Sequence, residues 1–223
     1  MTPQDETEHE TEIATESKSS GKGVAALILA AGAGTRMGGP KALLEFHGRL
    51  LVERAIDAAR AGGCTRIAVV LGAASERIRQ RADLRGTRIV VNQDWNEGIG
   101  SSLRAGLTQL AQDSESVSEE SGRVTADAAL VLLIDQPLVG ADAVRAVLGA
   151  WQDGARLAAA SYGGRRGHPV LLGREHWAAA ARDAIGDVGA RAFLAAHAAQ
   201  LVLVPCDAIA DPRDLDVPAD LNL

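Results

Sequence analysis

Short, continuous apolar runs alternate with helix-like segments through most of this 223-residue chain. The runs are four to seven residues long and are mostly apolar rather than alternating, as strands are when helices cover both faces of a parallel sheet. We expect strands at 24–29, 66–71, 88–91 and 128–134, and helices at 50–61, 75–82, 101–111 and 141–151. The pattern predicts an α/β fold, a three-layer α/β/α sandwich with a mostly parallel, Rossmann-like sheet.

The chain beyond residue 155 is less regular. An apolar run at 156–161 is followed by a glycine-rich turn, and the later elements are expected as a strand at 168–172, helices near 175–184 and 189–198, and a last strand at 201–204. We expect this part to carry the site of a second substrate and any antiparallel edge of the sheet.

Two acidic stretches stand apart from the rest of the chain. Residues 1–23 carry a net charge of −4 and residues 112–126 one of −3, so the remainder carries +1 of the total of −6. Both stretches are rich in Ser, Thr and Glu and have little to bury, so we expect a disordered acidic tail (1–23) and a disordered surface loop (112–126). One domain over residues 24–223 is the expectation for this length.

The near-neutral remainder argues against nucleic acid as a partner, since it holds no basic block. The two cysteines, Cys64 and Cys206, are too few for a disulfide framework, and we interpret both as small core residues in a reducing compartment. We find no charged and apolar leader pattern and no apolar stretch of about 18 residues. We therefore expect a cytoplasmic protein without a membrane segment.

The first apolar run leads directly into a glycine-rich, basic loop, Ala30-Ala31-Gly32-Ala33-Gly34-Thr35-Arg36-Met37-Gly38-Gly39-Pro40-Lys41. Glycines allow backbone N–H groups to turn toward an anion, and Arg36 and Lys41 add positive charge beside them. The loop predicts a polyphosphate ligand, whereas a solvated loop without a ligand is the alternative.

Two better-known phosphate loops fit less well. A P-loop requires Gly-Lys-Ser/Thr, but Pro40 precedes the lysine and Ala42 follows it. A dinucleotide-binding turn has its third glycine one residue earlier and passes directly into a helix. The sequence therefore disfavours a P-loop and a dinucleotide-binding turn but does not exclude them.

The strand expected at 128–134 ends at a carboxylate, Asp135, followed by Gln136 and Pro137. Ligands of open parallel sheets bind beyond the carboxyl ends of the strands where the strand order reverses. If this strand lies beside the first one, Asp135 faces the glycine loop, where Mg²⁺ takes one or two carboxylates plus substrate phosphates. The alternative for Asp135 is a cap of the next turn.

These motifs resemble the nucleotidyltransferases that transfer a nucleoside monophosphate to molybdopterin, and most of all the molybdenum cofactor cytidylyltransferases. The resemblance runs from about Val24 to the C-terminus. It is carried by the glycine loop with Asp135-Gln136-Pro137, by Asn92-x-x-Trp95-x-x-Gly98-Ile99-Gly100-Ser101-Ser102-Leu103, by Gly167-His168-Pro169, by Gly186-Asp187-x-Gly189-Ala190-Arg191 and by Asp214-Leu215-Asp216-x-Pro218. Ile99 replaces the family's usual Met, and the last motif lacks its usual Thr and Glu, which weakens any role for residues beyond Asp216.

The resemblance implies a fold of the nucleotide-diphospho-sugar transferase type and a Mg²⁺-dependent transfer of CMP from CTP to molybdopterin, with a molybdenum hydroxylase as a candidate client. It implies Arg36, Lys41 and Asp135 as catalytic residues and Asp135 and Asp216 as metal ligands. The nucleotide would contact Leu29, Ala30, Ala31, Gly32, Ala33, Gly34, Arg36, Lys41, Asn92, Gly98, Gly100, Ser101 and Ser102. The acceptor would contact Gln136, Arg166, Gly167, His168, Asp187 and Arg191.

Several of these residues have plainer interpretations. Ser101 is suited to an ordinary helix N-cap, Asp187 to capping the helix after it, and His168 to packing at the start of a strand. GTP-using relatives tend to have Gly where this chain has Ala31, so the added methyl group favours CTP by about 1 to 3 kcal/mol at most. The alternatives are another nucleotide and phosphorylated acceptor, a non-catalytic cofactor carrier, and an NADP-linked dehydrogenase.

Overall fold

A computed structural model describes residues 23–115 and 125–222. The predicted acidic tail lies outside these residues except for Gly23, which begins the first strand. Of the predicted loop, residues 116–124 also lie outside, whereas residues 112–115 complete a helix and residue 126 begins a strand. None of the described helices is long and apolar enough to cross a membrane.

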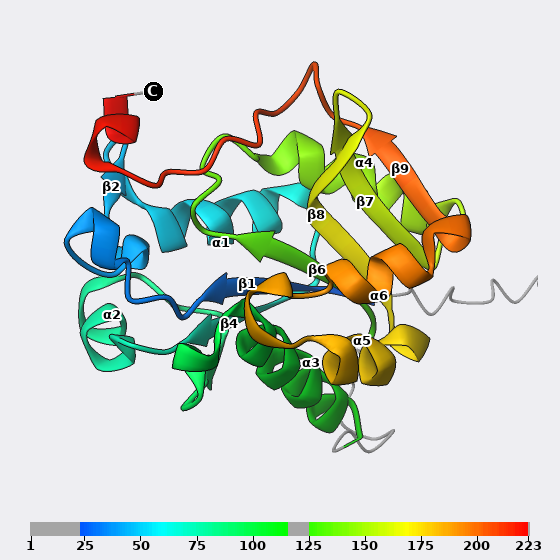
Figure 1. Cartoon of the computed structure of the whole chain (residues 1–223), viewed down its shortest axis with the longest axis horizontal. Helices are drawn as coiled ribbons and strands as arrows, with labels where there is room; N and C mark the ends of the chain where they lie inside the picture. The colour runs from blue at the N-terminus through cyan, green and yellow to red at the C-terminus, as the bar shows by residue number, and fades with distance from the viewer. Residues whose placement is uncertain (1–22, 116–124, 223) are drawn as a thin grey trace, which may run out of the picture.

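A seven-stranded sheet forms the middle layer of the described chain, in the order β5-β4-β1-β6-β8-β7-β9 (Figure 1). Its strands are β1 (Gly23–Ala30), β4 (Arg66–Leu71), β5 (Arg88–Val91), β6 (Ala126–Leu133), β7 (Leu157–Tyr162), β8 (Arg165–Gly173) and β9 (Leu201–Pro205). Short strands β2 (Glu45–Phe46) and β3 (Arg49–Leu50) pair separately. The predicted α/β sandwich with a mostly parallel sheet is confirmed.

Helices cover both faces of the sheet (Figure 1). The longer ones are α1 (Leu51–Gly62), α2 (Ser75–Arg81), α3 (Ile99–Glu115), α4 (Ala141–Gln152), α5 (Trp177–Asp183) and α6 (Arg191–Ala196). Helices α1 and α4 bury Ile56 and Val147 in the core on one face, and α3 and α5 bury Leu107 and Trp177 in the core on the other. These two apolar layers fix the position of the sheet, and with it the edge from which the loops after its strands leave.

The central pair β1 and β6 is parallel, with Leu29 opposite Leu133. Strands β4 and β5 continue the sheet from the other side of β1, so the strand order reverses between β1 and β6. The predicted neighbourhood of these two strands is therefore confirmed, and the loops that follow them leave the same edge of the sheet.

Any antiparallel strand was expected beyond residue 155, which is confirmed, and at an edge of the sheet, which is wrong. Strand β8 lies inside the sheet, antiparallel to both β6 and β7. Gly163 and Gly164 join β7 to β8 in a two-residue turn with φ of 56° and 73°. Such a turn suits the twist of a hairpin, so β8 folds back into the place beside β6.

Residues 206–217, which we call the C-terminal strap, return from β9 toward the end of β6 (Figure 1). Leu215 is fully buried, and its N–H donates to the carbonyl of Asp135 at 2.8 Å. The strap thus brings the C-terminal aspartates to the loop after β6. At its start, Cys206 is buried and free, and Cys64 is a partly buried free cysteine beside the same core, which confirms both as small packing residues.

Candidate active site

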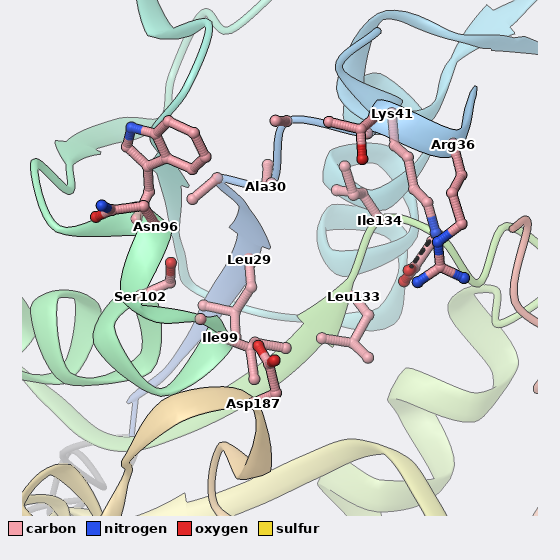
Figure 2. A pocket seen from close by; sticks show the side chains of 18 of the residues that line it. Leu29, Ala30, Arg36, Lys41, Asn96, Ile99, Ser102, Leu133, Ile134 and Asp187 are labelled. Carbon is pink, nitrogen blue, oxygen red and sulfur yellow. Dashed lines mark hydrogen bonds and ion pairs between the residues drawn. The ribbon is translucent and has the colours of Figure 1, made fainter. Parts of the chain in front are cut away.

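A cavity of about 510 Å³ lies where β1 and β6 end (Figure 2). Predicted site residues reach it from five segments of the chain. They are residues 29–34, 36 and 41 at the end of β1 and in the loop after it, Gly98 and Ser102 at the start of α3, Asp135 after β6, Asp187 before α6, and Asp216 from the C-terminal strap. The glycine loop and both predicted metal ligands therefore share one cleft.

Arg36 and Lys41 place positive charge at one end of this cavity. Figure 2 shows both side chains beside Ile134, at the end opposite Asn96 and Ser102. The local backbone sets the position of each side chain. Arg36 lies in a single 3₁₀ turn, Thr35–Met37, and Lys41 begins another, Lys41–Leu43, after Pro40. Two cations at one end and polar side chains at the other suit a nucleoside polyphosphate lying along the cavity.

The Lys41 ammonium lies between two carboxylates that are far apart in sequence. Its Nζ is 3.0 Å from Asp135 Oδ2 and 2.9 Å from Asp216 Oδ1. Burial lowers the pKa of Lys41, but attraction and hydrogen bonds from both aspartates outweigh it and hold that pKa above its usual value. Lys41 is therefore charged at neutral pH. The Asp135 carboxylate is engaged by this side chain, which favours the site interpretation over a turn cap.

The donor set fits a divalent cation. Two carboxylates converge within hydrogen-bond distance of a single cationic group, so this point already stabilises positive charge. The described residues contain no group of three His, Cys, Asp or Glu side chains that could hold a metal. Two carboxylates are a set that a hard divalent cation can use, with substrate phosphates and water as its other ligands.

Gly34 gives the loop after β1 its shape. Its φ is +61°, and its carbonyl accepts the N–H groups of Met37 at 2.9 Å and Gly39 at 3.2 Å. A Cβ at this position would lie 1.9 Å from the carbonyl oxygen of Gly39 and 2.9 Å from the nitrogen of Lys41. Glycine is therefore required here by both conformation and space.

Three predicted nucleotide contacts do not line the cavity: Asn92, Gly100 and Ser101. The Asn92 amide is buried and donates to the hydroxyl groups of Ser101 at 2.8 Å and Ser102 at 3.1 Å. Ser101 lies inside α3, so it is not the N-cap either, and a Cβ on Gly100 would meet the Ala184 backbone at 2.8 Å. Asn92, Gly100 and Ser101 therefore pack behind the residues that line the cavity and support them.

We expect Asn92→Ala to reduce the free energy of unfolding by about 2 to 3 kcal/mol. The change removes both serine contacts and the acceptor, 3.0 Å away, for the N–H of Asp94, all in a buried position. Urea denaturation measures the loss. Asn96→Ala is the matched control, because Asn96 is exposed and lines the cavity. It should change stability by less than about 0.5 kcal/mol while weakening nucleotide binding. Equal destabilisation by the two variants would contradict this assignment.

A second cavity, of about 290 Å³, adjoins the first and shares Leu29, Ile99, Leu133 and Asp187 with it. It contains all of the predicted acceptor residues, Gln136, Arg166, Gly167, His168, Asp187 and Arg191. The structure therefore brings these residues together. Their part in binding an acceptor stays a prediction.

Charged groups of both signs surround the second cavity. Burial, and then the nearby Arg191, lower the pKa of Arg166. Burial raises the pKa of Asp214, against the hydrogen bond from Gln136 that lowers it. Gly167 is needed for close packing, since a Cβ there would lie 2.8 Å from the Tyr162 ring. The arrangement offers guanidinium groups for a phosphate and carboxylates for N–H or O–H donors.

His168 should be neutral in this site. Burial lowers its pKa to about 4, against the attraction of Asp135, and Arg166 and Arg191 lower it further. The folded chain then binds fewer protons than the unfolded chain between about pH 4 and pH 6.5, so stability falls as the pH falls through this window. We expect the wild type to lose about 1 to 3 kcal/mol there and His168→Gln to lose less. Urea denaturation at pH 4.5 and 7 measures both; parallel losses would contradict it.

Sequence reasoning missed several residues that line the cavities. They are Thr35, Trp95, Asn96, Ile99, Leu133 and Ile134 in the first, and Leu103, Val131, Val170, Val188, Gly189, Ala190, Leu194 and Asp214 in the second. Trp95, Ile99 and Asp214 stood inside recognised motifs and carried a usable signal. Leu133 and Ile134 looked like ordinary strand residues, and only the pairing of β6 with β1 explains why they reach the site.

Comparisons with known proteins show the family to which the chain belongs. A family described as MobA-like NTP transferase domain matches residues 26–201. Nicotine blue oxidoreductase from Paenarthrobacter nicotinovorans is 37% identical over 201 residues, which is 86% of this chain and 92% of that protein. The crystal structure of Rv0371c from Mycobacterium tuberculosis H37Rv has a TM-score of 0.75 and 26% identity, covering 90% of this chain and 96% of the other.

A second structure of Rv0371c is a complex with manganese, with a TM-score of 0.70 and 25% identity over 90% of this chain and 96% of that one. The family match covers well over half of the chain, and it confirms at family level the resemblance seen in the motifs. The chain belongs to the MobA-like NTP transferase domain family and is an enzyme of the nucleotidyltransferase type.

Proposed function

We propose that the protein transfers CMP from CTP to molybdopterin in a Mg²⁺-dependent reaction that releases pyrophosphate. One observation carries the proposal: two adjoining cavities meet at a common wall, and the cations and two convergent aspartates lie at the end of the first. A nucleotide in one cavity and a phosphorylated acceptor in the other would meet at this boundary. The manganese complex of Rv0371c supports a divalent metal in a relative.

The reaction requires positioning and charge stabilisation from the protein. A phosphate oxygen of the acceptor bonds to the α-phosphorus of CTP, and the bond from that phosphorus to the bridging oxygen breaks as pyrophosphate leaves. Lys41, Arg36 and the glycine loop would hold the triphosphate and spread its negative charge. Asp135 and Asp216 would hold Mg²⁺, which neutralises charge on the phosphates when bound. The acceptor phosphate is largely ionised near neutral pH, so His168 need not act as a base.

Two features support CTP and an N–H-bearing acceptor. Ala31 is buried and lines the first cavity, so its methyl group reduces the room for a larger base. Asp187 and Asp214 line the second cavity and offer carboxylates to ring or amino N–H groups, while Arg166 and Arg191 suit a phosphate.

Pyrophosphate release tests this function. Protein, Mg²⁺ and molybdopterin are incubated with CTP, GTP, UTP or ATP in parallel. We expect the fastest release with CTP and none without molybdopterin. Release with GTP instead would correct the base, release only with a sugar phosphate would correct the acceptor, and no release with any pair would overturn the proposal.

The name of the relative nicotine blue oxidoreductase favours a second candidate, hydride transfer from a nicotinamide dinucleotide bound in the same cavity. Fluorescence titration with NADPH separates the two functions. Saturable NADPH binding together with no pyrophosphate release would support the oxidoreductase.

We place the catalytic unit at residues 24–223, with the acidic tail and the acidic stretch at 112–126 outside its chemistry. We propose a cytoplasmic location and delivery of the product to a molybdenum hydroxylase client. A carrier that only binds the cofactor would not need Arg36, Lys41 and Asp135 together in one cleft.

A further inference from the structure

The side chain of Gln136 connects the two segments that carry the aspartates of the site. It follows Asp135 directly, and its Nε2 donates to Asp214 Oδ1 at 2.9 Å and to the carbonyl of Pro212 at 3.1 Å. Asp214 precedes Asp216 by two residues. The contact therefore joins the neighbours of both Lys41-bound aspartates across 78 positions of sequence.

Both amide protons of Gln136 are used by the C-terminal strap. Its other amide atom, Oε1, is buried and has no hydrogen-bond partner among the described residues. A rotation of the amide by 180° would move Oε1 away from its present position. Oε1 would then face two other acceptors, the Pro212 carbonyl and the Asp214 carboxylate, and would be repelled by both. The contacts with the strap thus fix the orientation of the amide although an acceptor is left unpaired.

Backbone contacts also align the strap with the loop after β6. The N–H of Leu215 donates to the carbonyl of Asp135 at 2.8 Å, and that of Asp211 to the carbonyl of Leu138 at a longer 3.4 Å. Asp216 itself lies at a half-exposed position, with 53% of its side chain accessible. Its position relative to Asp135 depends on how the segment before it is held.

We propose that Gln136 is a positioning residue that sets the distance between Asp135 and Asp216 and thereby the affinity of the site for a divalent cation. This inference rests on the proposed function, because it assumes that these two aspartates hold the metal. It assigns to Gln136 a task other than the predicted contact with the acceptor. Neither glutamate, which cannot donate, nor a shorter side chain can replace it.

The test is a titration of Mn²⁺ into the full chain with a non-hydrolysable CTP analogue, followed by electron paramagnetic resonance. We expect Gln136→Met to weaken Mn²⁺ binding about tenfold and Gln136→Glu to weaken it further, since a carboxylate would face Asp214. Gln152→Met is the matched control at an exposed position on α4 and should bind as the wild type does.

The polarity of the contact can be reversed. In the double variant Gln136→Glu with Asp214→Asn, the new asparagine donates to the new carboxylate, so we expect Mn²⁺ affinity to recover in part. Unchanged binding by Gln136→Met, or no recovery in the double variant relative to Gln136→Glu, overturns the inference alone. A wild-type protein that binds no Mn²⁺ with the nucleotide overturns the metal site and the proposed function with it.

Discussion

Asp135→Asn should abolish most of the pyrophosphate release, with kcat reduced on the order of 10²–10³-fold. The amide keeps the shape of the side chain but removes the negative charge that faces Lys41 Nζ at 3.0 Å and that would face Mg²⁺. Binding of the acceptor should stay within a few-fold, because Asp135 lines the first cavity and not the second. Steady-state kinetics across a Mg²⁺ series and acceptor titration measure the two effects.

Asp142→Asn supplies the matched control for this result. Asp142 lies at the start of α4, and its exposed carboxylate pairs with Arg145 on the surface. Its loss should leave kcat within a factor of about two, since exposed ion pairs contribute little. An Asp135→Asn variant with near-normal turnover would favour the carrier hypothesis instead.

Gly34→Ala should reduce kcat/KM for the nucleotide on the order of 10²-fold. The new methyl group would lie 1.9 Å from the Gly39 carbonyl oxygen, so the loop must move at Arg36 and Lys41. Displacement of positioned groups by about 1 Å can cost this much. The sheet should keep its stability, because residues 32–41 of the loop belong to neither apolar core.

Gly38→Ala separates the clash from the conformational cost of replacing a glycine. Gly38 also has a positive φ, of +75°, but a Cβ there meets nothing within 4 Å. We expect a loss in kcat/KM of only a few-fold, from left-handed strain of about 1 to 2 kcal/mol. Equal losses in the two variants would mean that strain alone acts, and that the approach of Gly34 to Gly39 has no part in the site.

Much of the architecture follows from local sequence. The strands at 66–71 and 88–91 were predicted with the bounds that the structure gives, because apolar runs between turns need no distant information. Helix α3 is longer than predicted at both ends. Its last turn is polar and has the composition of a loop, so the sequence did not indicate a helix there. The inner place of β8 depends on tertiary pairing with β6, which no local pattern encodes.

The same limit applies to the site. Asp135 was predictable, because a carboxylate at the end of a buried strand falls at the ligand-binding edge of a parallel sheet. Asn92 and Ser101 are equally polar, yet the Asn92 amide donates to the Ser101 hydroxyl group, and neither residue lines the cavity. A sequence gives the type of a polar residue, whereas the direction of its side chain depends on where the helix beside it begins.

The most direct test of the central claim is a crystal structure with Mn²⁺ and a non-hydrolysable CTP analogue, with the metal located by anomalous scattering. We predict one metal peak bound by Asp135 and Asp216, with the triphosphate along residues 31–36 and the Lys41 ammonium turned toward phosphate. A nucleotide bound elsewhere, or a metal away from both aspartates, would contradict the account.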